Sequence, residues 1–179
     1  MTVIGTASGD GATIQISAID EGDGLKFTIE VIDGYADLRG FFFDYTGGDL
    51  ALAGSGTAFD SDGSPLANAV TASSLNGDDI TKVGSNDNNM NGTGETFDAG
   101  LMFGASGGMT AKGVNDDVQM IEFTISGLTF DDLGTIGEVD GLWFGIRALS
   151  VGSTEESRED SVKLLGTFDL TNIEDGTVG

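Results

Sequence analysis

Apolar and polar residues alternate with a period of two along much of the chain, which is typical of β-strands that bury one face. Two such runs lie between residues 12 and 33, and the segment DEGDG at residues 20–24 separates them. Acidic residues and glycines of this kind favour a tight turn. The pattern therefore predicts a β-hairpin over residues 12–33. Its apolar positions are Ile14, Ile16 and Ala18 on the first strand and Phe27, Ile29 and Val31 on the second.

The same alternation predicts further strands along the rest of the chain. One of them contains the continuous run Phe41, Phe42 and Phe43, which favours a central strand covered on both faces. A short helical turn is predicted at residues 130–133, and no window of 12 or more residues carries a helical apolar stripe. The predicted strands cover residues 38–45, 97–103, 118–126, 142–149 and 163–170.

Three segments are less regular. Residues 46–96 are rich in small residues, Gly, Asn and Asp, and we expect long loops there, with one or two short strands and a helical turn near residues 73–75. A separate strand is predicted over residues 1–9. It is either an ordinary edge strand or a donor strand that pairs with a neighbouring subunit and builds a filament. Residues 171–179 are expected to form a tail.

The number of strands indicates the fold class. We expect one domain over residues 1–179, since this length suits one domain better than two. One open sheet could not cover its own apolar face. The expected fold is therefore an all-β, two-sheet antiparallel β-sandwich or jelly roll of about seven to nine strands with long acidic loops.

The net charge of the chain limits the classes of partner that can be expected. Thirty Asp and Glu residues face seven Lys and Arg residues, which gives a net charge of −23 at pH 7. Nucleic acids and anionic membrane surfaces are bound through basic residues, so neither is expected as a partner. Bound divalent cations, high external salt or a cationic partner would relieve the self-repulsion of such a domain. Calcium is favoured because it takes oxygen ligands from Asp, Asn and backbone carbonyls, and the alternative is acidity that serves solubility alone.

Composition also limits catalysis. The chain has no Cys and no His, which nearly excludes zinc, haem, iron–sulfur and thiol chemistry. No Cys or His nucleophile–base pair can be assembled, and thirty acids make some carboxylate pair unavoidable, so such a pair is weak evidence for glycoside hydrolysis. We therefore expect that the protein is not an enzyme. No stretch reaches the roughly 18 apolar residues of a membrane span, and no membrane insertion is expected.

Three acidic loops are candidate calcium sites. The second carries a D-x-D-G turn but lacks the remaining ligands of an EF-hand, and the third concentrates neutral oxygen donors around one acid. Because turns select Asp, Asn and Gly in any case, each loop also has a purely structural interpretation. The candidate ligands are Asp20, Glu21 and Asp23 in the first loop, Asp60 and Asp62 in the second, and Asp78, Asp79, Asn86, Asp87, Asn89 and Asn91 in the third.

Trp143 and Arg147 are candidate ligand-binding residues. They share one face of the predicted strand 142–149, and Trp143 is the only tryptophan. An exposed Trp beside an Arg could stack on a sugar ring. The alternative is that Trp143 packs beneath a loop or in a subunit interface. Arg39 and Arg147 also lie inside strands, and we expect them to pair with carboxylates such as those of Asp37 or Asp44.

Several stretches of the chain resemble a known module. They are LRGFFFD at residues 38–44, FDAGL at 97–101, DDV at 116–118 leading into FTIS at 123–126, FGIRALSVG at 144–152, and then Arg158, Ser161, Lys163, Leu164 and Gly166. In this order they resemble a β-sandwich module of large secreted bacterial proteins of the RTX, hemolysin-type calcium-binding class, over roughly residues 12–168. The resemblance implies a secreted or cell-surface location, calcium, export without an N-terminal signal, and no catalytic residues.

Two features depart from that class. The glycine-rich calcium repeats (G-G-x-G-x-D) are not found in the sequence, so the calcium prediction rests on the three acidic loops. The short length fits a free-standing subunit better than a passenger module of a giant adhesin.

Three functions are open at this point. The first is a calcium-stabilised structural or adhesive extracellular module, with self-assembly into surface fibres or biofilm matrix as one form. The second is a carbohydrate-binding module that uses Trp143 and the acidic loops, with a glycan as partner. The third is a hydrolase on a lectin-like sandwich.

Overall fold

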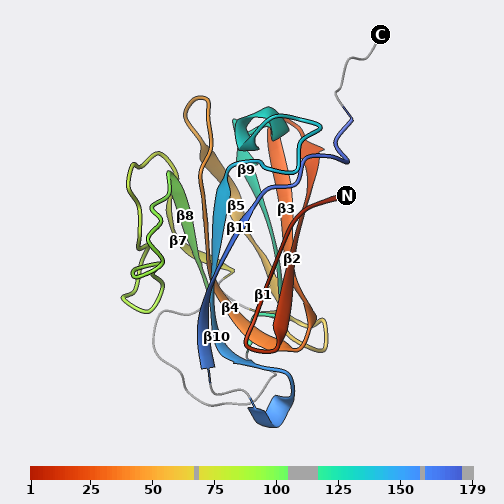
Figure 1. The fold of residues 1–179 in the computed structure, drawn as a ribbon, viewed down its shortest axis with the longest axis vertical. Coiled ribbons are helices and arrows are strands. Elements are labelled where there is room, and N and C mark those ends of the chain that lie inside the picture. Colours follow the sequence, from red (N-terminus) through yellow and green to blue (C-terminus); the bar gives the residue numbers. More distant parts are fainter. Residues whose placement is uncertain (67–68, 105–116, 158–159, 175–179) are drawn as a thin grey trace.

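The computed structural model describes residues 1–66, 69–104, 117–157 and 160–174, which form a sandwich of two antiparallel sheets (Figure 1). One sheet has six strands in the order β1-β2-β3-β9-β5-β6, and the other has five in the order β11-β10-β4-β8-β7. The predicted all-β sandwich is confirmed, with eleven strands in the described residues instead of seven to nine. The elements are β1 (Thr2–Gly9), β2 (Ala12–Glu21), β3 (Gly24–Asp33), β4 (Tyr35–Phe43), β5 (Ala51–Phe59), β6 (Pro65–Leu66), β7 (Val70–Ser74), β8 (Ala99–Phe103), β9 (Met120–Ser126), η2 (Phe130–Leu133), β10 (Trp143–Gly152), η3 (Glu155–Ser157) and β11 (Asp160–Thr167).

The N-terminal strands follow the predicted hairpin. β2 and β3 pair antiparallel over their whole length and end at Glu21↔Gly24 beside the turn, which confirms the hairpin over residues 12–33. β1 pairs with β2 from Thr2↔Ala18 to Gly9↔Ala12. It therefore forms the outer edge of the chain's own six-stranded sheet, in agreement with the edge-strand interpretation.

Strand β4 is central and is covered on both faces, as its aromatic run predicts. It lies between β10 and β8, and Phe41, Phe42 and Phe43 have no exposed surface. Because side chains alternate along a strand, Phe41 and Phe43 enter the main core between the sheets, where their rings lie 5.7 Å and 6.3 Å from that of Phe27. Phe42 points to the outer side of the five-stranded sheet and packs 5.8 Å from Phe97.

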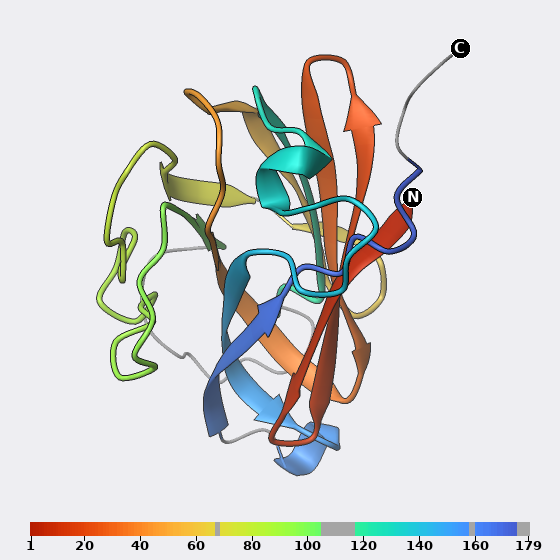
Figure 2. The same cartoon turned by 45° about the horizontal axis from the view of Figure 1, so that its top comes forward.

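The outer side of the five-stranded sheet is covered by residues 76–97, which we call the flap (Figure 2, light green). The flap is held to itself by the isolated bridges Ile80↔Phe97 and Lys82↔Asn89. Its apolar side chains enclose a second, smaller core against the sheet. This core consists of Phe42 and Met102 from the sheet and Val83, Met90 and Phe97 from the flap.

A buried amide joins the flap to the sheet beside Gly40. Asn88 is 1% exposed, and its Nδ2 donates to the carbonyls of Val83 and Leu101 across 3.0 Å and 3.2 Å. A Cβ on Gly40 would lie 1.9 Å from Asn88 Oδ1. Glycine is therefore needed at this position of β4, because any larger residue would displace the flap.

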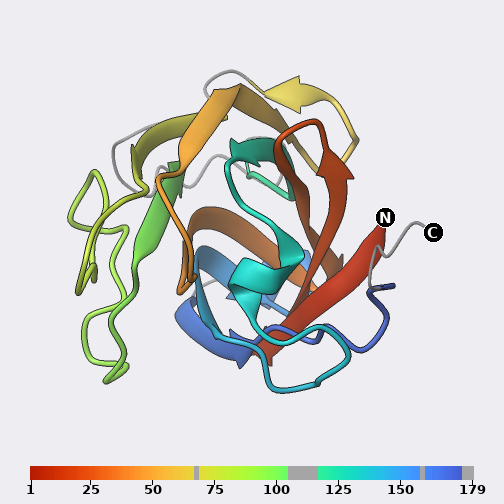
Figure 3. The same cartoon turned by 90° about the horizontal axis from the view of Figure 1, so that it is seen from above.

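Residues 46–96 contain more strand than predicted. β5 has the sequence ALAGSGTAF, whose small residues show no apolar alternation, and it is held by backbone pairing with β9. The helical turn predicted near residues 73–75 is wrong, because Ser73 and Ser74 pair with β8 as part of the edge strand β7. The turn predicted at residues 130–133 is confirmed as the 3-10 helix η2, which lies over one end of the sandwich (Figure 3). None of the helical segments in the described ranges is long and apolar enough to cross a bilayer.

Candidate functional site

Two carboxylates meet where β4 ends and β8 begins. The last register pair of these strands is Phe43↔Ala99, so Asp44 and Asp98 are the next residues on either strand. The carboxylate of Asp44 accepts a hydrogen bond from the backbone N–H of Asp98. In return, the backbone N–H of Tyr45 donates to Oδ2 of Asp98 across 3.3 Å. Each carboxylate is thus held by the neighbouring strand.

The charge of this pair is unfavourable at neutral pH. Partial burial, together with the negative charges of Asp98 and Glu95, raises the pKa of Asp44 to about 6, against the hydrogen bond from the Asp98 N–H. A carboxyl with a raised pKa is stabilised by a proton, by a nearby cation or by another change that offsets its charge. The pair can therefore accept hydrogen bonds from a hydroxyl-rich ligand, or contribute oxygens to a hard cation whose other ligands come from elsewhere.

Trp143 lies on the next strand, beside Asp44. Its backbone carbonyl accepts a hydrogen bond of 2.9 Å from the Asp44 N–H, and the residue is 42% exposed. On its other side Trp143 is in register with Thr167 of β11. Residues in register point to the same face of a sheet, whereas the following residue, Phe144, enters the main core. Thr167, Trp143, Asp44 and Asp98 therefore form one row across β11, β10, β4 and β8.

A groove of about 240 Å³ follows the seam where the edge strands β1 and β11 of the two sheets meet. Val3 and Val139 line it and are 43% and 59% exposed. Thr167 lines it too, so Trp143 lies beside its rim. We call this surface the seam face and define it as Val3, Val139, Trp143, Thr167 and Asp169.

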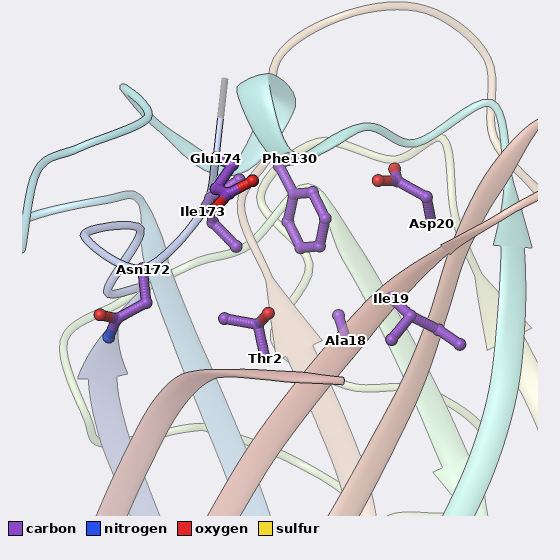
Figure 4. Close-up of a pocket in the computed structure, with 8 residues that line it drawn as sticks. All are labelled: Thr2, Ala18, Ile19, Asp20, Phe130, Asn172, Ile173 and Glu174. Atoms are coloured by element: carbon purple, nitrogen blue, oxygen red, sulfur yellow. The ribbon is translucent and has the colours of Figure 1, made fainter. Parts of the chain in front are cut away.

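The first candidate calcium loop is the turn between β2 and β3. Asp20, Glu21 and Asp23 are all exposed there. The carboxylate of Glu21 reaches back over the sheet and accepts a hydrogen bond from the hydroxyl of Thr124. Asp20 instead lines a separate groove between β2 and the C-terminal segment (Figure 4). The structure thus directs these carboxylates to different neighbours.

The second candidate loop forms a turn closed on its own first acid. Oδ1 of Asp60 accepts hydrogen bonds from the backbone N–H groups of Asp62 and Ser64, at 2.9 Å and 2.8 Å. This is the geometry in which an Asp side chain stabilises a tight turn. One oxygen of Asp60 is therefore engaged within the turn, while Asp62 is exposed.

The third candidate loop belongs to the flap, and basic side chains bind its oxygens. Three of the five basic residues that the structure describes contact it. Positively charged side chains thus already bind three of the oxygens in this loop. The contacts join Lys82 Nζ to Asn86 Oδ1 at 2.8 Å, Arg147 Nε to the Asp87 carbonyl at 2.9 Å, and Lys163 Nζ to the Asn91 carbonyl.

The remaining residues of this loop stabilise its turns. Asn89 donates to the Asn86 carbonyl and accepts from the Asn91 N–H, while Oδ1 of Asp79 accepts from the Thr96 hydroxyl at 3.0 Å. Asp78 is exposed. Within the described ranges, no group of three or more acidic side chains is arranged to hold a metal ion. Calcium binding therefore stays a prediction.

The expected carboxylate partner is confirmed for Arg39 and is wrong for Arg147. Arg39 Nη2 lies 2.7 Å from Oδ2 of Asp37. Arg147 is 9% exposed beneath the flap and donates to backbone carbonyls, including that of Val162 at 3.0 Å. Burial lowers the pKa of Arg147, and the charge of Asp87 opposes that shift. Arg147 therefore fixes the flap and does not share the exposed surface of Trp143.

Comparisons with known proteins give no functional information, so a function has to be inferred from the geometry described above. No protein-family model matches the chain, and searches of curated proteins and of solved structures also return no match. The motif resemblance to the RTX-type module therefore stays a prediction.

Sequence reasoning named Asp44 only as a carboxylate partner for an arginine and did not predict that Asp44 and Asp98 meet. A signal was present, since each directly follows a phenylalanine, in Phe43-Asp44 and Phe97-Asp98. Their meeting depends on the pairing of β4 with β8, two strands that are far apart in the sequence. Alternation predicts strands but does not predict which strands become neighbours.

Proposed function

We propose that the chain is a non-enzymatic structural or adhesive module of the bacterial cell exterior, stabilised by calcium, that attaches through the seam face. The observation that carries this proposal is the exposure of Val3 and Val139 in one groove and of Trp143 beside its rim. Exposed apolar residues rimmed by polar ones mark interaction surfaces. Two edge strands, β1 and β11, border the same face, and such strands are templates for further pairing.

Calcium enters the proposal through charge. Two copies of a chain with net charge −23 repel each other, and divalent cations held between carboxylates reduce that repulsion. A ligand that binds only the folded state also stabilises it. The motif resemblance to secreted RTX-type modules supports the extracellular location.

Self-association in calcium tests the proposal. We expect light scattering and electron microscopy to show assemblies in millimolar calcium and monomers in chelator, with a melting temperature several degrees higher in calcium. Val139→Ser combined with Trp143→Ser should abolish assembly, because it removes two of the three exposed apolar side chains of the seam face. Ile32→Ser is the control, since Ile32 is 48% exposed near the C-terminal end of β3 and is not part of the seam face. A strict monomer under both conditions would contradict self-association, and equal effects of the two variants would contradict the seam face.

Carbohydrate binding is the second candidate, and the row across the five-stranded sheet favours it. An exposed Trp beside two carboxylates combines a stacking surface for a sugar ring with acceptors for sugar hydroxyls. Here Trp143 lies between Thr167 on one side and Asp44 and Asp98 on the other.

A glycan array tests this second candidate. We expect binding by the wild type that Trp143→Ala weakens by about tenfold or more, because buried aromatic contact dominates such interfaces. Val139→Ser is the control, since it changes the groove and keeps the row. No bound glycan, or binding that survives Trp143→Ala, would contradict the candidate.

A further inference from the structure

The chain contains two Asn-Gly pairs, Asn76-Gly77 and Asn91-Gly92. Asparagine is a heat-labile residue, because the main-chain nitrogen of the following residue can attack the side-chain Cγ and release the amide as ammonia. Glycine in the following position favours this attack, since it has no side chain to hinder the approach and restricts the main chain least. The two pairs are chemically equivalent in the sequence, and the structure holds them in different ways.

Asn91-Gly92 lies in an open turn of the flap. Thr93 closes the turn, since its N–H and its hydroxyl both donate to the carbonyl of Met90, across 3.2 Å and 2.8 Å. Asn91 and Gly92 are exposed, and Gly92 has a φ of 88°. In the described part of the chain, neither the side-chain amide of Asn91 nor the N–H of Gly92 has a hydrogen-bond partner. The two reacting groups are therefore free to approach each other.

Asn76-Gly77 is held on both reacting groups. The side chain of Asn76 pairs with the main chain of Leu50, since Oδ1 accepts from its N–H across 2.7 Å and Nδ2 donates to its carbonyl across 3.0 Å. The N–H of Gly77 donates to the carbonyl of Asp98 across 3.1 Å. A Cβ on Gly77 would lie 2.3 Å from Cδ1 of Ile80, so the main chain is closely packed there. Attack on the Asn76 amide would have to break these contacts first.

We propose that Asn91 is a site of spontaneous deamidation in the folded protein and that the fold protects Asn76 from the same reaction. The nitrogen of Gly92 loses its proton and bonds to Cγ of Asn91, the bond from Cγ to Nδ2 breaks, and Nδ2 takes up a proton and leaves as ammonia. Water then opens the cyclic imide at either carbonyl and leaves aspartate or isoaspartate at position 91. The reaction needs water alone, because attacking and attacked groups belong to neighbouring residues.

The modification changes the flap where it contacts β11. Nζ of Lys163 donates to the main-chain carbonyl of Asn91. Opening of the imide to isoaspartate turns that carbonyl into a free carboxylate, so the hydrogen bond from Lys163 becomes charge-assisted, and the main chain of the flap becomes one carbon longer. Opening to aspartate adds the same negative charge on the side chain. The site is separate from the seam face, and the proposal does not depend on the function assigned to that face.

Peptide mapping of the whole folded chain tests the proposal. The protein is incubated for several weeks at mildly alkaline pH and physiological temperature and is then digested with trypsin, which cleaves after Lys82 and separates the two pairs. Each deamidation raises the mass of a peptide by about 1 Da, and fragmentation assigns it to a residue. We expect Asn91 to convert at least about tenfold faster than Asn76. In guanidinium chloride the two residues should convert at similar rates, because the contacts of Asn76 are then lost.

Two variants complete the test. Asn91→Gln keeps an amide but moves it one methylene farther from the nitrogen of Gly92, so the fast mass gain should disappear. Asn86→Gln makes the same change at another exposed residue of the flap and should leave the conversion of Asn91 unchanged. Equal conversion of Asn76 and Asn91 in the folded chain would overturn the proposal, as would a fast mass gain that survives Asn91→Gln. If Asn76 also stays slow in guanidinium chloride, its protection by the fold is wrong.

Discussion

Replacement of Arg147 by alanine is expected to lower the free energy of unfolding by about 2–4 kcal/mol and to release the flap from the sheet. The guanidinium donates to the carbonyls of Asp87 in the flap and Val162 in β11, at 2.9 Å and 3.0 Å. It is 9% exposed, so water does not readily replace these bonds. Hydrogen bonds from a charged donor are worth more than neutral ones, and loss of the donor leaves buried carbonyls unsatisfied.

The expected consequence reaches the second core. Val83, Met90 and Phe97 pack on Phe42 only while the flap lies on the sheet. We therefore expect the backbone amides of Val83, Met90 and Phe97, which bond within the flap, to exchange hydrogen much faster in Arg147→Ala than in the wild type. Hydrogen exchange of the β2 and β3 amides should stay slower than that of the flap amides, because the main core is unchanged.

Two further variants separate geometry from charge. Lys163→Ala removes a half-buried basic residue that contacts the same loop, and it should cost at most about 1 kcal/mol. Arg147→Lys keeps the charge but loses the planar group that reaches both carbonyls, so it should resemble Arg147→Ala more than the wild type. If Lys163→Ala loosens the flap as much as Arg147→Ala, the special role of the buried guanidinium is wrong.

The strands that alternate clearly could be predicted from the sequence. The hairpin of β2 and β3 and the strand β9 each bury one face, so their apolar residues recur at every second position. The aromatic run in β4 correctly predicts a strand covered on both faces. The cover on the outer face could not be predicted, because it is the flap, whose sequence of Asn, Asp and Gly resembles a solvent-exposed loop.

The candidate sites were harder to predict because they depend on tertiary contacts. Residues 86–91 contain many oxygen donors, which suggests calcium, but the structure brings Lys82, Arg147 and Lys163 to those oxygens. β5 lacks an apolar pattern because it is held by backbone pairing with β9, with Ala58 as its one buried residue. Only the paired strands reveal that Asp44 and Asp98 meet and that Trp143 lies beside them.

The free energy of unfolding is expected to fall as the pH rises from about 5 to about 7.5, and Asp37 should account for much of this change. Burial raises the pKa of Asp37 from 3.8 to about 6, although the charge of Arg39 and the hydrogen bond from the Val118 N–H oppose the shift, and Asp117 adds to it. Because the folded-state pKa lies above the unfolded value, the protonated native state is favoured. The resulting stabilisation is complete below about pH 4 and is lost as the pH rises through about 6.

The shift of about two pH units corresponds to about 2–3 kcal/mol for Asp37, which is 4% exposed. The raised pKa of Asp44 acts in the same direction with a smaller share, because solvent screens a carboxyl that is only partly buried. Chemical denaturation of the wild type at about pH 5 and about pH 7.5 measures the part of this loss that falls between those two pH values.

Two substitutions at Asp37 distinguish its charge from its hydrogen bond. In the wild type the Val118 N–H donates to Oδ1 of Asp37 across 2.9 Å. Asp37→Asn keeps an oxygen that can accept this hydrogen bond, but its side chain cannot ionise, so the free energy of unfolding should depend much less on pH. Asp37→Ala removes that acceptor and should cost about 1–3 kcal/mol even at about pH 5, because the Val118 N–H stays buried. Asp33→Asn removes one charge from an exposed residue and controls for the net charge of the chain. If Asp33→Asn flattens the pH dependence as much as Asp37→Asn, repulsion over the whole surface accounts for it and the buried carboxyl does not.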